Sequence, residues 1–130
     1  MTKEWLRLYG AAKSVLNSQK ISEYVEIGSV AAALETEKGN IYVGVCVDTA
    51  CGLGVCAERN AIFNMLTNGE RCIKKIIAIN TDEQAIPPCG ACREMLAQLM
   101  PKDYKSIHIM LDINKCLVVT LEELTPSWWL

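Results

Sequence analysis

C-A-E-R at Cys56–Arg59 and P-P-C-G-A-C at Pro87–Cys92 are the two stretches that decide the fold. Each contains a cysteine where a helix is predicted to begin, and the interval between them has room for one helix, one strand and one loop. Such a crossover brings the starts of both helices to the same edge of a sheet. A helix N-terminus favours the negative form of a thiol through its exposed N–H groups and its dipole. We therefore expect the thiols of Cys56, Cys89 and Cys92 to converge at this edge.

The three thiols and a nearby carboxylate predict a catalytic metal site. Sulfur ligands suit Zn²⁺, and three of them leave the fourth tetrahedral position open for water, as catalytic zinc requires. Glu58 follows the first cysteine by two residues and can accept a proton from water and deliver it elsewhere. The pattern indicates hydrolysis. The alternatives are that the cysteines are ordinary buried residues, or that Cys51 closes a purely structural zinc site.

Apolar periodicity divides the rest of the chain into alternating helices and strands. An amphipathic helix is predicted over residues 3–17, where apolar residues recur at three- and four-residue steps. Strands are predicted at 29–35, 41–48, 75–80, 106–111 and 115–119, and further helices at 56–67, from 89 to before Pro101, and from 120. The nearly all-apolar strand at 41–48 is typical of one covered on both faces. The order favours an α/β fold, a mixed sheet with helices packed on its faces, in a single domain over residues 1–130.

The composition restricts the classes of partner. Hydrophobic residues make up 51 % of the chain, too many for a disordered protein. The net charge of −2 and the lack of a Lys/Arg run offer no electrostatic footprint for nucleic acid, so a small molecule is the expected partner. No apolar stretch is long enough to span a membrane, and the charged N-terminus is unlike a signal peptide. The odd number of cysteines, seven, then favours reduced thiols and a cytoplasmic location over a disulfide framework.

The two cysteine stretches, in this order and with the acidic residue after the first, resemble the zinc-dependent cytidine deaminase family. The resemblance covers most of the chain and includes residues 56–61, residues 88–93 and the tail E-L-T-P-S at 123–127. It implies a three-layer α/β/α fold, with a five-stranded mixed sheet and helices on both faces. It also implies one Zn²⁺ per chain and a homotetramer whose sites are completed across interfaces, with a homodimer as the alternative.

The resemblance implies a reaction as well. Cytosine would be deaminated hydrolytically at C4, in a free nucleoside or nucleoside analogue of the cytidine or deoxycytidine type, to give a uracil product and ammonia. Glu58 would protonate ring N3 and later pass a proton to the departing amine. Arg59 matches an arginine that, in nucleoside-type members, hydrogen-bonds a cysteine ligand and offsets the excess charge of three thiolates on zinc.

Five positions are expected to contact the substrate on the basis of the resemblance: Cys46, Asp48, Ala57, Pro88 and Trp129. Cys46 and Asp48 stand where the family has N-x-E, an amide and a carboxylate that hold the ribose, and the thiol lacks the two donors and the carbonyl of the amide. Ala57 and Pro88 adjoin the metal ligands. Trp129 has the spacing of an aromatic residue that closes over a base, often in a neighbouring subunit, although a hydrophobic plug on its own domain is the alternative.

The segment Gly28–Ala31 departs from the F-P-V-G of the family, so the phenyl wall of the base pocket is missing. Departures of this kind affect the recognition of the substrate and leave the cysteines expected to bind zinc unchanged. Blasticidin S deaminase also departs from the nucleoside pattern in this region and acts on a cytosine joined to a non-ribose sugar, so an enzyme of that type is the first alternative. An editing-type deaminase of RNA or DNA and a non-catalytic zinc-binding interaction domain are the others.

Overall fold

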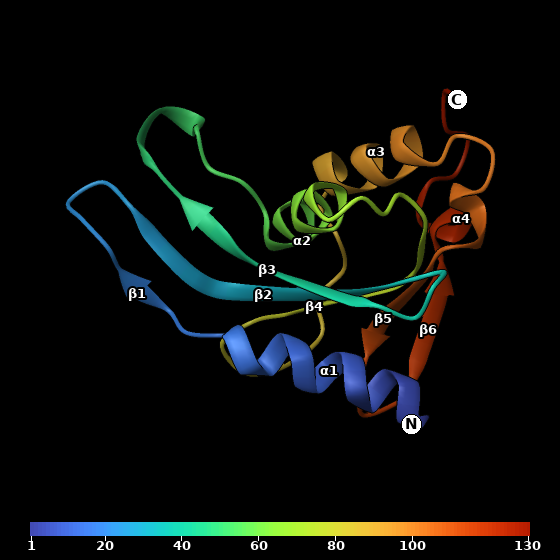
Figure 1. Ribbon diagram of the computed structural model, residues 1–130, viewed down its shortest axis with the longest axis horizontal. Coiled ribbons are helices and arrows are strands. Elements are labelled where there is room, and N and C mark those ends of the chain that lie inside the picture. The colour runs from blue at the N-terminus through green and yellow to red at the C-terminus, as the bar shows by residue number, and fades with distance from the viewer.

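The computed structural model describes residues 1–130 and shows a mixed β-sheet between two layers of helices (Figure 1). Its strands are β1 (Gln19–Lys20), β2 (Glu26–Thr36), β3 (Ile41–Asp48), β4 (Ile73–Ile79), β5 (His108–Asp112) and β6 (Leu117–Thr120). Its α-helices are α1 (Lys3–Val15), α2 (Ala57–Thr67), α3 (Gly90–Leu99) and α4 (Leu121–Leu124). The expected α/β/α arrangement is confirmed. None of these helices is long and apolar enough to cross a membrane.

The sheet is built around β2, which pairs antiparallel with β3 along one edge and with β4 along the other. β5 then pairs parallel with β4, and β6 antiparallel with β5, so the five expected strands form one mixed sheet. The two-residue strand β1 beside the start of β2 makes a sixth. Apolar periodicity did not predict this strand because both of its residues are exposed.

The two faces of the sheet bury different residues of the same strands. Ala31 and Ala33 of β2 pack with α1, whereas the intervening Ala32 and Leu34 pack with α2 and α3 on the opposite face. This alternation follows from the two-residue period of a strand, and the alanines allow the helices to approach the sheet closely. The expectation that helices cover both faces is confirmed, and β3, although an edge strand, is covered by helices on both sides.

Several boundaries differ from the sequence-based prediction: α1 ends at Val15 instead of residue 17, β2 begins at Glu26 instead of residue 29, and β4 begins at Ile73 instead of residue 75. The strand expected from residue 106 begins at His108, because Tyr104–Ser106 form a single turn of 3-10 helix. The strand expected from residue 115 begins at Leu117, because Cys116 adopts a positive φ of 51° in the preceding turn. The capping box at the start of α4 forms as expected, with Thr120 and Glu123 satisfying each other's backbone N–H groups.

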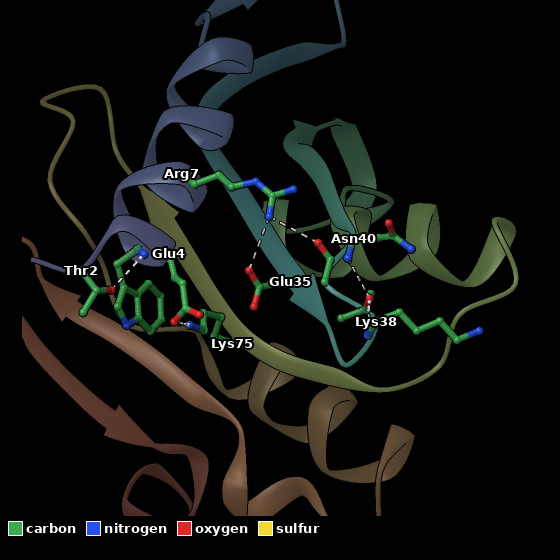
Figure 2. A network of polar contacts seen from close by, with 10 residues as sticks. Thr2, Glu4, Arg7, Glu35, Lys38, Asn40 and Lys75 are labelled. Atoms are coloured by element: carbon green, nitrogen blue, oxygen red, sulfur yellow. Dashed lines mark hydrogen bonds and ion pairs between the residues drawn. The ribbon is translucent and has the colours of Figure 1, made fainter.

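A buried charged network fixes α1 to the sheet, as Figure 2 shows. Glu35 of β2 and Lys75 of β4 face each other across the strands and are buried under the first two turns of α1. Lys75 Nζ lies 2.9 Å from Glu4 Oε2, and Arg7 Nη1 lies 4.0 Å from Glu35 Oε1. Each buried charge therefore has an opposite charge on α1 in addition to its neighbour in the sheet, which limits the cost of burying it.

The backbone of α2 rests directly on β3 at Gly44, and this contact requires glycine. A Cβ at Gly44 would lie 2.7 Å from the backbone carbon of Asn60 and 2.9 Å from the carbonyl oxygen of Ala57, and would collide with the backbone nitrogen of Ala61. We expect Gly44→Ala to lower the free energy of unfolding by about 1–3 kcal/mol, because α2 must move away from the sheet.

Urea unfolding measures this change. Gly10→Ala in α1 is the matched control, because nothing lies within 4 Å of the added Cβ and alanine is the better helix former. An equal loss of stability in both variants would contradict the close packing of α2 on β3.

Candidate active site

The thiols of Cys56, Cys89 and Cys92 lie together at one edge of the sheet. Cys56 Sγ is 3.4 Å from Cys89 Sγ, which is 3.6 Å from Cys92 Sγ, and all three sulfurs lie within 4.8 Å of one another. Around a tetrahedral zinc with bonds of about 2.3 Å, sulfurs would lie about 3.8 Å apart. The arrangement is therefore close to that of three zinc ligands.

The direction of the strands explains why the thiols meet. β3 and β4 both run antiparallel to β2, so they run parallel to each other and the helices that follow them begin at the same edge. Cys56 is the N-cap of α2 and Cys89 the N-cap of α3. Cys92 lies in the first turn of α3, where it is fully buried, and is the third thiol of the group. The crossover expected from the spacing of the two stretches is what brings the three thiols together.

The electrostatics of the thiols call for a cation. Burial raises the pKa of the Cys92 thiol, and the negative charges of Glu58 and Cys56 raise it further. Burial also acts to raise the pKa of Cys89, but hydrogen bonds from the backbone N–H groups of Cys92 and Ala91 and from the thiol of Cys56 outweigh it, so this pKa is lowered. Three such thiols cannot all be negative without a positive ion between them, and sulfur donors in this geometry suit Zn²⁺.

No fourth side chain completes the group. Cys51 lies outside it, as do all other Cys, His, Asp and Glu residues. The alternative of a structural zinc site closed by Cys51 is therefore wrong. A metal held by these three thiols keeps one tetrahedral position for a ligand that the protein does not supply, which is the property that distinguishes catalytic from structural zinc sites.

Glu58 reaches the same place from the first turn of α2. Its side chain is 4 % exposed and lines the cavity into which the thiols of Cys56 and Cys89 also face. Burial raises the pKa of the Glu58 carboxyl, and the positive charge of Arg59 opposes this rise only in part. A carboxyl group in such surroundings exchanges protons more readily near neutral pH than an ordinary glutamate.

The cavity itself has a volume of about 450 Å³, within the range of pockets that hold small molecules. Of the five expected substrate contacts, Cys46, Asp48 and Ala57 line it, whereas Pro88 and Trp129 do not. Pro87 takes the place expected for Pro88. Ser29 and Val30, from the segment that departs from the family pattern, also line the cavity, together with Thr49, Val55 and Ile86, which the sequence did not single out.

Comparisons with known proteins agree with this geometry. Residues 7–107 match the family described as "Cytidine and deoxycytidylate deaminase zinc-binding region". A cytidine deaminase of Halalkalibacterium halodurans is 36 % identical over 101 residues, which cover 75 % of this chain and 74 % of that protein. The chain belongs to the cytidine deaminase family. It is an enzyme of the hydrolytic deaminase type.

Two further relatives indicate the breadth of this family. A blasticidin-S deaminase of Bacillus cereus is 33 % identical over 107 residues, 75 % of this chain and 74 % of that protein. The crystal structure of a cytidine deaminase from Burkholderia pseudomallei is 29 % identical, with a TM-score of 0.76 over 99 % of this chain and 100 % of that one. The likeness to the solved structure therefore extends over the whole deaminase fold.

Two arginines of this deaminase make hydrogen bonds at or beside the cysteine group. Arg59 Nη2 donates to Cys56 Sγ over 3.6 Å, as the resemblance implied. Arg93 had no predicted role, yet its Nε donates to the carbonyl of Pro88 at 2.8 Å and its Nη1 to that of Leu124 at 3.0 Å. Arg93 thus ties the loop that precedes Cys89 to the C-terminal helix α4. Only the fold brings these two carbonyls within its reach.

The two C-terminal tryptophans of the deaminase have different surroundings. Trp128 packs against the core under α2 and α3, whereas Trp129 is 69 % exposed. The indole Nε1 of Trp129 donates to the carboxylate of Glu94 on α3, at 2.8 Å and 3.1 Å from its two oxygens. Trp129 is therefore held in an exposed position, away from the cavity of its own chain, so the alternative of a hydrophobic plug applies to Trp128 instead.

Proposed function

We propose that this protein is a zinc-dependent hydrolytic deaminase that converts the cytosine of a free nucleoside or nucleoside analogue into uracil, with release of ammonia. The observation that carries the proposal is the meeting of three thiols and one buried carboxylate in a single cavity. Thiols alone would fit a structural site. A proton-transferring carboxylate beside a three-ligand metal site is the combination that hydrolysis needs.

Cys56, Cys89 and Cys92 would hold the zinc, which, when bound, supplies an activated water to the cavity. Arg59 lies against the Cys56 sulfur and offsets part of the negative charge of the three thiolates. Glu58 moves the protons in two rounds: it accepts one from water and delivers it to ring N3, and it then accepts the proton of the hydroxyl added at C4 and delivers it to the departing amine. Its raised pKa, due to burial, makes both accepting and donating accessible near neutral pH.

The substrate is a small molecule that enters the cavity with its ring toward the thiols. Ala57 lies beside Cys56 at the inner end, where it can contact the ring, while Asp48 lies at the end of β3, where it can contact the substituent on ring N1. The cavity volume of about 450 Å³ accommodates a nucleoside. The net charge of −2 does not favour a nucleic-acid substrate.

A second candidate is a blasticidin S deaminase-type enzyme that acts on a cytosine with a larger, non-ribose substituent. Two observations favour it: the relative from Bacillus cereus, and a hollow of about 280 Å³ that shares Asp48 and Thr49 with the cavity. Glu23, Tyr24 and Glu26 line the rest of this hollow. A substituent longer than a pentose could extend into it without leaving the site.

Side-by-side assays separate these candidates. Zinc-loaded protein is offered cytidine, deoxycytidine, cytosine and blasticidin S, and turnover is followed by ammonia release and by the loss of cytosine absorbance. We expect deamination of cytidine or deoxycytidine, loss of activity after chelation, and its return on adding zinc. Activity on blasticidin S alone would favour the second candidate. A protein that binds one zinc per chain and deaminates none of the four would refute the proposed substrate class.

We also propose that the active form is a homotetramer, with a homodimer as the alternative, in the cytoplasm. The exposed ring of Trp129, held by Glu94 outside its own cavity, is suited to close the site of a neighbouring subunit. All seven cysteines are free, as expected in a reducing compartment. Light scattering at micromolar concentration tests the assembly, and a monomer that is fully active would contradict shared sites.

A further inference from the structure

A bulge in β2 lies beside the active-site cavity. The regular pairing of β2 with β3 is interrupted between Ile27 and Ala31, so the residues between them leave the ladder. Gly28 makes this possible with a φ of +82°, and a Cβ at this position would collide with the backbone of Asn17. The carbonyl of Gly28 in turn accepts a hydrogen bond from Asn17 N–H at 3.1 Å. Bulges next to active sites commonly redirect a side chain.

The side chain that the bulge redirects is Ser29, which lines the cavity. Its Oγ lies 3.2 Å from the Sγ of Cys46 on β3. The same sulfur accepts a hydrogen bond from Val30 N–H at 3.3 Å and lies 3.9 Å from Oδ2 of Asp48. Cys46 is only 7 % exposed. It therefore lies behind Ser29 and Asp48, in contact with both, and has little surface left for a substrate.

The donors and acceptors of Ser29, Cys46 and Asp48 determine which atom donates in each of their hydrogen bonds. The carboxylate of Asp48 can only accept, so the thiol proton of Cys46 is directed to it. The hydroxyl of Ser29 then donates to the sulfur, and the lone pairs of its oxygen are left for a partner in the cavity. Ser29 and Asp48 thus both present acceptors. A substituent on ring N1 that carries hydroxyl or amine donors would satisfy them.

We propose that Ser29 is a specificity-determining residue that accepts a hydrogen bond from a donor on the N1 substituent of the substrate, and that Cys46 is a positioning residue that holds Ser29 and Asp48. This inference rests on the proposed function, whose substrate it defines more narrowly. Cys46 then orients the groups that contact the substrate, in place of the direct contact expected from the resemblance. Ser29, one residue beyond Gly28, supplies from β2 a hydrogen-bonding group that the thiol cannot supply from β3.

The test compares two ligands that share the cytosine ring and differ in the N1 substituent: the ribose of cytidine carries hydroxyl donors, and the methyl group of 1-methylcytosine carries none. Their affinities are measured by calorimetry on zinc-loaded protein in a Glu58→Gln background, which prevents turnover. We expect Ser29→Ala to lower the ratio of cytidine affinity to 1-methylcytosine affinity by about three- to tenfold, the usual effect of one neutral hydrogen bond. Cys46→Ala should lower the same ratio, and Cys46→Ser, which keeps a donor and an acceptor, should restore it.

Ser14→Ala and Cys72→Ala are the matched controls, because neither residue lines the cavity, and both should leave the ratio unchanged. An unchanged ratio in Ser29→Ala, or an equal loss of affinity for both ligands, would overturn the role of Ser29. If the ratio falls but the Glu58-containing protein releases no ammonia from any cytosine compound, the recognition role stands and the proposed reaction fails. A protein that binds neither ligand would refute both.

Discussion

Replacing Glu58 by glutamine is expected to reduce kcat for the preferred cytosine substrate by about 10³- to 10⁴-fold while zinc stays bound. General acid–base catalysis commonly contributes about 10²- to 10⁴-fold, and here one carboxylate carries every proton transfer, so the upper part of that range applies. Glutamine keeps the size and much of the hydrogen bonding of the side chain but cannot carry a proton between water and the ring. Steady-state ammonia release gives kcat, and metal analysis of the same sample gives the zinc content.

The buried position of Glu58 means that a loss of kcat in Glu58→Gln can be attributed to this one carboxylate. Its side chain is 4 % exposed, and no other carboxylate lines the inner part of the cavity, since Asp48 lies at the end of β3. Glu122→Gln on α4 is a matched control, because Glu122 is exposed and pairs only with Lys105 at 3.9 Å. A Glu58→Gln enzyme with more than a tenth of the original kcat would refute the proposed proton transfer.

Cys92→Ser is expected to abolish zinc binding at micromolar metal, because it removes one of the three thiols proposed to hold the ion. Residues that merely support a ligand commonly change metal affinity about 10–100-fold, and loss of a ligand itself should exceed that. The original protein should also be stabilised by zinc, by about 2.7 kcal/mol at a hundredfold excess over Kd. Thermal unfolding with and without zinc should therefore show a shift that Cys92→Ser lacks.

Cys72→Ser provides the comparison for this variant. Cys72 is another free cysteine, outside the metal-binding group, so its replacement removes a thiol but no ligand. It should retain both the zinc content and the zinc-dependent shift. If Cys92→Ser bound one zinc per chain as tightly as the original protein, Cys92 would not be a ligand and the convergence of the three thiols would have no chemical role.

The convergence of the three thiols and the layers of the fold were predictable because both depend on local sequence patterns. Cys56 and Cys89 each precede an apolar helical pattern. The interval between them holds one helix, one strand and one loop, so the second helix begins at the same edge of the sheet as the first. The alternating order of helices and strands and the nearly all-apolar strand at 41–48 likewise indicated helices on both faces of a sheet. Patterns of this kind depend little on how the chain packs, so they can be recognised in the sequence without the tertiary structure.

The wall of the cavity opposite the ligands was not predictable in the same way. Ser29 would point elsewhere in a regular strand, and only the bulge at Gly28, held against the distant Asn17, directs it to Cys46. Arg93 is similar, since its two carbonyl partners lie in separate segments of the chain. Long-range contacts decide which face of the sheet each side chain points to after a bulge, and a local sequence pattern does not encode those contacts.

The sequence by itself thus determined the chemistry of this protein: three thiols and one carboxylate, set at the starts of two helices that one crossover places side by side. The tertiary structure decided which side chains line the cavity, because Ser29 of β2 meets Cys46 of β3 only through the pairing of these strands. It also separated Trp128, which packs against the core, from Trp129, which stays exposed and hydrogen-bonds Glu94 of α3. The positions of the cysteines at two helix starts can be recognised from local sequence patterns. The shape of the cavity depends on how distant strands and helices pack.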